Sequence, residues 1–142
     1  MSADAEVLRV VQEWVSKAEN DLRTATHTLK LQSSCPTDTV CFHAQQCVEK
    51  YVKALLVLRA IPFPKTHDLS VLTRTLPESW QPVLSREQVR RLTDYATVTR
   101  YPGDYEPVTL AEARAAITIA RKVRKHVRAL LPSPKPRRRR RS

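Results

Sequence analysis

Amide and basic side chains recur at helical spacing in the first half of this 142-residue sequence, where they could hold a phosphate group. Gln46, Lys50 and Lys53 are spaced i, i+4, i+7, so they form one polar stripe on a helix that is otherwise apolar. If the stripe faces a cleft or a dimer seam, it could bind a nucleotide phosphate. The alternative is an exposed helix face on which Glu49 and Lys53 form an i, i+4 ion pair.

A second set of cations lies near the C-terminus. At 100° per residue its four members fall within about 60° of one another on a helical wheel; they are Arg114, Arg121, Lys125 and Arg128. This set could follow the phosphates of an RNA strand. It could equally be a solvated helix face whose cations lie near the negative end of the helix dipole.

Histidine and cysteine side chains offer proton transfer and metal binding as further chemistry. His67 and Asp68 begin a short helix, where the imidazole could carry a proton or could simply pack or cap. His43 and Cys47 are spaced i, i+4, as two zinc ligands can be, but no second ligand pair follows at metal spacing. We therefore predict neither a metal site nor a cofactor. Because the three cysteines are an odd number without a C-x-x-C pair, we predict no disulfide framework.

The composition narrows the class of protein. The sequence contains 25 Lys and Arg against 14 Asp and Glu, for a net charge of +11, which favours anionic partners such as RNA or nucleotides. Gly103 is the single glycine, which excludes phosphate loops rich in glycine and disfavours a sheet with many tight turns. No signal peptide and no membrane-spanning apolar run is recognisable, so we expect a cytoplasmic protein.

The elements that must position these residues are helices. Apolar residues recur every three or four positions, and the pattern predicts helices over residues 4–31, 37–59 and 109–131. A shorter helix is expected over 69–76, with Thr66 as its cap, and another over 85–98. Capping-box pairs are expected at Ser85 with Gln88 and at Thr109 with Glu112. The sequence thus predicts an all-α, up-and-down bundle of four long helices and one short helix over residues 1–131. A disordered, arginine-rich tail is expected over 132–142.

Several strings along this bundle together resemble one known family. They are AENDL at 18–22, CFHAQQCVEK at 41–50, KALL at 53–56, THDL at 66–69 and TRYP at 99–102. The combination resembles the HEPN domain, a helical domain named for nucleotide binding in higher eukaryotes and prokaryotes. The resemblance implies a homodimer, a partnership with a minimal nucleotidyltransferase as toxin and antitoxin, and often a metal-independent ribonuclease.

The ribonuclease motif of that family is an arginine followed four to six residues later by a histidine. Here Arg100 is followed at the fifth position by Tyr105, which can donate a proton but is a poor base because tyrosine ordinarily has a pKa near 10. If cleavage occurs, we expect Arg100 to be the phosphate-stabilising group, with His67 or Tyr105 as candidate proton carriers in place of the missing histidine. The alternative is a non-catalytic module that binds nucleotides or a partner protein and carries a degenerate motif.

Overall fold

The computed structural model describes residues 4–96 and 107–132, which contain five α-helices and no β-strand. This confirms the predicted all-helical fold. The helices are α1 (Ala5–Leu29), α2 (Thr37–Leu58), α3 (Leu69–Thr75), α4 (Arg86–Tyr95) and α5 (Leu110–Leu130). Two short 3-10 helices that we did not predict, Gln32–Ser34 and Glu78–Trp80, lie in the connections. Arg100, Tyr105 and the arginine-rich tail fall outside the described residues.

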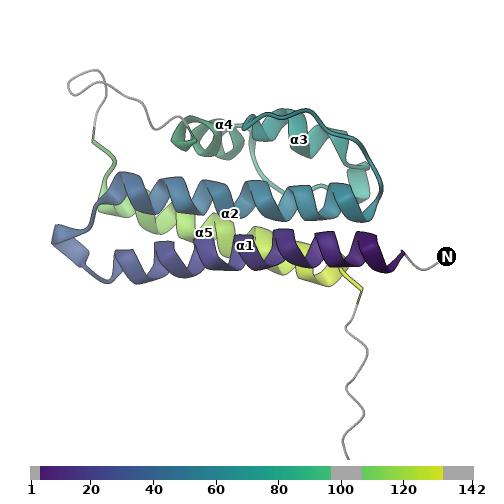
Figure 1. Cartoon of the computed structure of the whole chain (residues 1–142). Coiled ribbons are helices and arrows are strands. Elements are labelled where there is room, and N and C mark those ends of the chain that lie inside the picture. Colours follow the sequence, from purple (N-terminus) through teal and green to yellow (C-terminus); the bar gives the residue numbers. More distant parts are fainter. Residues whose placement is uncertain (1–3, 97–106, 133–142) are drawn as a thin grey trace, which may run out of the picture.

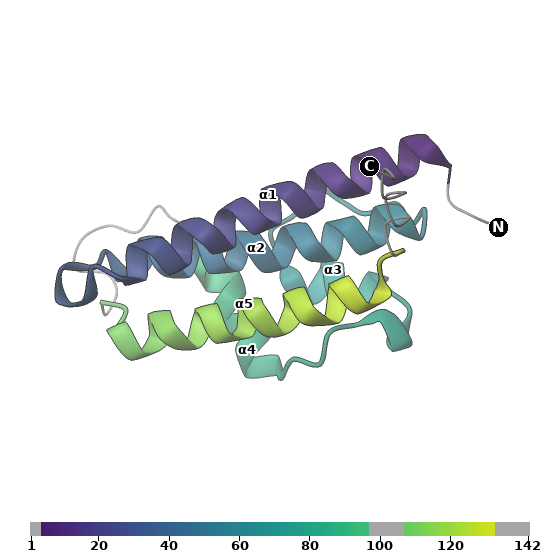
Figure 2. The same ribbon diagram turned by 90° about the horizontal axis from the view of Figure 1, so that it is seen from below.

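The three long helices lie side by side, and the two shorter ones cover another side of α2 (Figure 1). α1 and α2 run antiparallel, and α5 runs parallel to α2 (Figure 2). α2 packs against each of the other four helices, whereas the other main contacts are those of α1 with α5 and of α3 with α4. α2 is therefore the central helix of the bundle.

The core explains why α2 is central. Val48, Tyr51 and Leu55 are fully buried, and so are Cys41 and Cys47 on the same helix. α1 and α5 contribute one buried face each, and their other residues are partly or fully exposed. The buried residues of these two faces are Val11, Val15, Ala18, Asp21, Leu22 and Ala25 on α1, and Ala113, Ala116, Ile117, Ala120, Val123 and Val127 on α5.

The two predicted capping boxes have different outcomes. Ser85 and Gln88 form the full reciprocal box at the start of α4. Thr109 accepts the backbone N–H of Glu112 at the start of α5, but the Glu112 carboxylate accepts from the Tyr95 hydroxyl at 3.0 Å instead of returning to Thr109. The acid that would complete the second box thus ties α5 to the end of α4. α4 itself ends at Tyr95, three residues earlier than predicted.

The cap of α3 also differs from the prediction. Asp68, rather than Thr66, is the N-cap, since its side chain accepts the backbone N–H of Ser70 at 2.9 Å. Thr66 accepts the backbone N–H of Asp68 at 3.0 Å and so supports the cap from two residues earlier. These bonds fix the backbone on either side of His67.

α2 ends in a conformation that normally favours glycine. Ala60 has a φ of 55°, in the left-handed region. Its N–H donates to Val57 O at 3.0 Å, and the N–H of Ile61 donates to Leu56 O at 2.9 Å. These two bonds are the Schellman pattern that satisfies the last carbonyls of a helix. The turn sends residues 61–68 back along α2, where His67 bonds Glu49.

Candidate functional site on the polar face of α2

Five polar side chains form a strip along one side of the central helix, which we call the α2 polar face. On a helical wheel they span about 120°; they are His43, Gln46, Glu49, Lys50 and Lys53. α1 contributes Asp21 to this face, and the loop before α3 contributes His67. The strip is thus built from three segments that lie far apart in the sequence.

Asp21 organises the first half of the α2 polar face. One of its carboxylate oxygens lies 2.8 Å from Nδ1 of His43, and the other accepts a hydrogen bond from Lys50. Asp21 is only 8% exposed because it occupies the apolar side of α1 that packs on α2. A buried carboxylate is tolerated when it is paired in this way.

Glu49 organises the second half. It is 2% exposed and bonds three groups, namely Nζ of Lys53 at 3.0 Å, Nε2 of Gln45 at 3.0 Å and Nδ1 of His67 at 2.8 Å. Nε2 of Gln46 donates to Oε1 of Gln45 at 2.6 Å. The result is one hydrogen-bonded network that joins the amides to the ion pair.

His67 combines a buried anchor with an exposed ring. The Glu49 carboxylate is 3% exposed at its side chain, whereas the His67 side chain is 67% exposed. Because Nδ1 faces the carboxylate, Nδ1 carries the hydrogen and Nε2 is the nitrogen that can accept a proton from a ligand. His43 repeats this arrangement on Asp21, with a side chain that is 26% exposed. The α2 polar face thus presents two carboxylate-held imidazoles next to two lysines.

The structure brings four of the predicted site residues together. It also corrects the alternative interpretation, in which Glu49 and Lys53 form an ion pair on an exposed helix face. Gln46 and Lys53 share the Glu49 network with His67, and Lys50 lies next to them on Asp21. The predicted ion pair of Glu49 with Lys53 is present. It is not an exposed pair, however, because the Lys53 side chain is only 12% exposed and stacks 5.4 Å from the Trp14 ring.

The predicted cationic stripe on α5 lies apart from this site. Arg114, Arg121, Lys125 and Arg128 are all exposed, as a stripe on the outer side of α5 must be. Arg128 bonds Glu19 of α1 at 2.7 Å. No hydrogen bond or ion pair within the described ranges joins the stripe to the α2 polar face, so the structure does not unite the two predicted phosphate-binding sets.

Glu19 is the point at which three helices meet. It accepts hydrogen bonds from the Tyr51 hydroxyl on α2 and from Arg124 and Arg128 on α5, the latter two at 2.7 Å. Burial alone would raise the pKa of Glu19, but the hydrogen bonds from Tyr51 and Arg124 and the nearby guanidinium charges outweigh it and lower the pKa. Burial and the bond to Glu19 raise the pKa of Tyr51. This cluster is a structural clamp rather than a proton-transfer site.

Other chemistry finds little support among the described side chains. Burial raises the pKa of the Cys41 thiol to about 12 and also raises the pKa of Cys47, which disfavours the reactive thiolates. Residues 4–96 and 107–132 contain no group of three His, Cys, Asp or Glu side chains that could hold a metal ion. In the same ranges no helix has the length and apolar character needed to cross a membrane.

Comparison with known proteins places the chain in a family. The HEPN domain matches residues 11–130, nearly the full length of the helical bundle. The chain belongs to the HEPN domain family. A curated relative from Methanocaldococcus jannaschii, named "Putative toxin MJ1304", is 32% identical over 106 residues, covering 69% of this chain and 67% of the relative.

Solved structures of two relatives share the HEPN fold of this chain. TT1696 from Thermus thermophilus superposes with a TM-score of 0.69 at 28% identity, covering 85% of this chain and 98% of TT1696. ST0689, an archaeal HEPN homologue, superposes with a TM-score of 0.65 at 28% identity, covering 84% of this chain and 96% of ST0689. The predicted resemblance and the helical fold are thereby confirmed.

Proposed function

We propose that this HEPN protein binds RNA and cleaves it without a metal ion, as the toxin-side member of a pair with a nucleotidyltransferase. The observation that carries the proposal is His67, an exposed imidazole held at Nδ1 by the buried carboxylate of Glu49. A carboxylate in this position fixes the tautomer and orientation of a general base. The archaeal relative whose name describes a toxin supports the toxin part of the proposal.

The reaction would be an attack of the RNA on its own phosphodiester. Nε2 of His67 would accept the proton of the 2′-hydroxyl while O2′ bonds to phosphorus. The bond from phosphorus to O5′ then breaks, and O5′ takes up a proton, for which the Tyr105 hydroxyl is the candidate donor. The products are a 2′,3′-cyclic phosphate and a 5′-hydroxyl end.

Cationic groups would stabilise the extra negative charge on the phosphorus oxygens in the transition state. Arg100 takes this role by resemblance to the family. Lys50 and Gln46 on the α2 polar face are the proposed contacts for the neighbouring phosphates, since Gln46 belongs to the network of His67 and Lys50 lies beside it. Lys53 would hold Glu49 in place beneath them. A homodimer would bring a second copy of these groups near the first.

The experiment compares variants on the same RNA. Purified protein is incubated with tRNA and total RNA in EDTA, alongside Arg100→Ala, His67→Ala and the control His27→Ala. His27 is an exposed imidazole in the last turn of α1, without a hydrogen-bond partner for its side chain among the described residues. We expect cleavage by the wild type and by His27→Ala. We expect a loss of about a hundredfold or more in His67→Ala, as is usual for a lost acid–base group, and in Arg100→Ala, as is usual for a lost charge-stabilising group.

The outcomes separate the reaction from simple binding. Full cleavage by His67→Ala would remove the imidazole from the mechanism. A folded wild type that binds RNA or nucleotides but leaves every RNA intact would favour the non-catalytic binding module. Circular dichroism checks that each variant keeps the helical signal of the wild type.

A further inference from the structure

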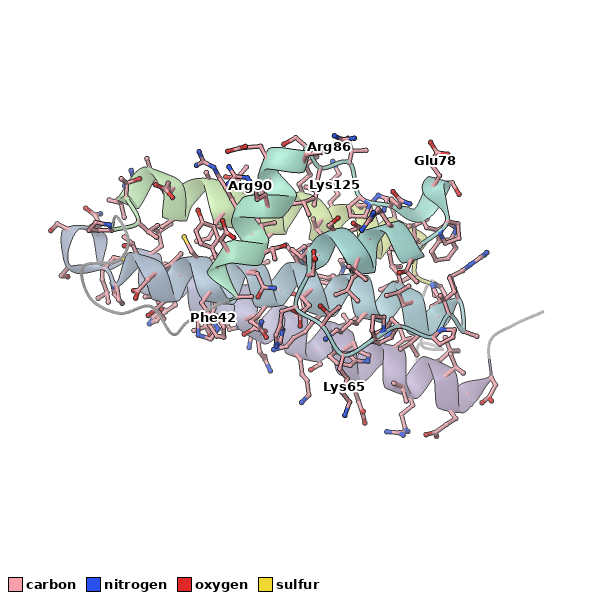
Figure 3. The ribbon with its side chains drawn as sticks, turned by 90° about the horizontal axis from the view of Figure 1, so that it is seen from above. Phe42, Lys65, Glu78, Arg86, Arg90 and Lys125 are labelled. Carbon is pink, nitrogen blue, oxygen red and sulfur yellow. The ribbon has the colours of Figure 1, made fainter. Side chains whose placement is uncertain are left out.

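A groove between α3 and α4 gathers cations that the proposed reaction does not use. It has a volume of about 660 Å³, which is in the range that holds small-molecule ligands. Arg74 lines it from α3, and Arg86 and Arg90 line it from α4. Figure 3 looks onto these two helices and labels Arg86 and Arg90 on the first half of α4. No residue of the α2 polar face lines this groove.

The three guanidinium groups retain most of their hydrogen-bond donors. Within the described residues the Arg86 side chain has no hydrogen-bond or ion-pair partner, and Arg74 donates only from Nε to Ser70 O at 3.1 Å. Arg90 shares a single carboxylate, that of Glu87, with Arg91, at 3.0 Å from each. Planar guanidinium groups with unused donors match the oxygens of a phosphate.

The other residues that line the groove suit the rest of a nucleotide. Leu84 and Val89 provide an apolar surface on which a base can lie, and Gln81 is an amide that can bond a base edge. The carboxylates of Asp68 and Asp94 also line the groove, so that three arginines outnumber two acids there. Asp68 already caps α3 through the N–H of Ser70.

We propose that the α3–α4 groove is a second nucleotide site, in which Arg74, Arg86 and Arg90 hold a phosphate group. The ligand is a nucleotide, either free or as one unit of an RNA strand. Asp68, which directly follows His67, is one of the residues that line the groove, so an RNA strand seated in it would pass next to the exposed imidazole. In that respect the inference rests on the proposed function, for which the groove supplies the positioning of the strand.

The test is a charge-matched pair of triple variants. The first is Arg74→Gln/Arg86→Gln/Arg90→Gln. The second is Lys17→Gln/Arg23→Gln/Lys30→Gln on and just after α1, which removes the same charge from exposed positions outside the groove. Binding of a fluorescein-labelled single-stranded RNA of about 12 nucleotides is measured by anisotropy over a range of salt concentrations, with AMP and ATP as competitors.

We expect the groove variant to lose about tenfold or more in RNA affinity. Three lost phosphate contacts should also lower the slope of log affinity against log salt by about 2. The α1 variant should keep an affinity within about twofold of the wild type. Competition by AMP or ATP would identify free nucleotides as ligands, and its absence would restrict the site to RNA.

Two results would overturn the groove as a site. These are equal losses in both triple variants, or an unchanged affinity in the groove variant. The same experiments can refute the groove site and the His67 reaction independently of each other. His67→Ala should bind the labelled RNA like the wild type without cutting it, whereas the groove variant should cut at saturating RNA and lose rate only when RNA is scarce.

Discussion

Replacing Glu49 with glutamine tests whether a buried ion pair holds the α2 polar face together. Glu49 is 2% exposed and neutralises Lys53, whose side chain is 12% exposed. Removing one partner of a buried pair leaves the other charge uncompensated and costs about 3–5 kcal/mol. Because glutamine keeps the volume and one acceptor oxygen, we expect the lower end of that range, about 3 kcal/mol.

Urea unfolding followed by circular dichroism measures this loss. With a slope of about 1.5 kcal/mol per molar urea, 3 kcal/mol corresponds to a midpoint lowered by about 2 M. The matched control is Glu87→Gln on α4, where the carboxylate pairs with two exposed arginines. Exposed pairs contribute about 0.2–1 kcal/mol, so the control should move the midpoint by less than about 0.7 M. All proteins are compared at one concentration, since a dimer would unfold in a concentration-dependent way.

A double variant separates lost charge pairing from a general disturbance of the helix. Lys53→Met removes the orphaned ammonium and leaves an apolar chain to pack on Trp14. Glu49→Gln/Lys53→Met should therefore recover more than half of the stability that Glu49→Gln loses. A Glu49→Gln midpoint equal to that of Glu87→Gln, or a double variant as unstable as the sum of its parts, would refute the buried ion pair.

Three further predictions concern the clamp, the end of α2 and the thiols. Since the pKa of Glu19 is lowered on folding, its stabilisation is present above its ordinary value of 4.5 and is lost as pH falls through the folded value. Urea midpoints should accordingly fall more steeply below about pH 4.5 in the wild type than in Glu19→Gln, and parallel profiles would contradict this. Ala60→Gly should raise the free energy of unfolding by about 1 kcal/mol, because glycine adopts the left-handed conformation without strain; a lower urea midpoint would count against it. In the native protein at about pH 8, iodoacetamide should modify the partly exposed Cys35 well before Cys41, whose pKa burial raises to about 12; mass spectrometry that finds equal rates would contradict the burial.

The helices could be predicted from the sequence because their apolar residues recur at one period and their ends carry recognisable caps. The starts of α2 and α3 agree with the prediction to the residue, and α5 begins one residue later. The caps were harder to predict, since a side chain such as Glu112 can serve either its own helix or a neighbour. In the structure Glu112 accepts a hydrogen bond from Tyr95 of α4 and does not complete the cap of its own helix.

The site could be predicted only in part. Helical spacing alone places Gln46, Lys50 and Lys53 on one stripe. It does not reveal that Asp21 and Glu49 are buried beneath them, because the burial depends on how α1 and the loop before α3 pack on α2. One signal was present in the sequence: Asp21 interrupts the otherwise apolar face of α1, where an acid needs a partner.

The contribution of the histidines also depended on tertiary structure. His67 and Glu49 are 18 positions apart, so no local pattern joins them. The i, i+4 spacing of His43 and Cys47 suggests only a pair of metal ligands, whereas in the structure His43 bonds Asp21 and Cys47 is buried. The packing of three segments around α2 thus turns isolated polar residues into a connected network.

The chemistry of the RNA ends tests the central claim most directly. Wild-type protein is incubated with a single tRNA in EDTA, and the termini of the fragments are identified by mass spectrometry. Base-assisted attack by the 2′-hydroxyl predicts 2′,3′-cyclic phosphate and 5′-hydroxyl ends, at sites that disappear in His67→Ala and persist in His27→Ala. Fragments with 3′-hydroxyl and 5′-phosphate ends, or intact tRNA after incubation with folded protein, would contradict the account.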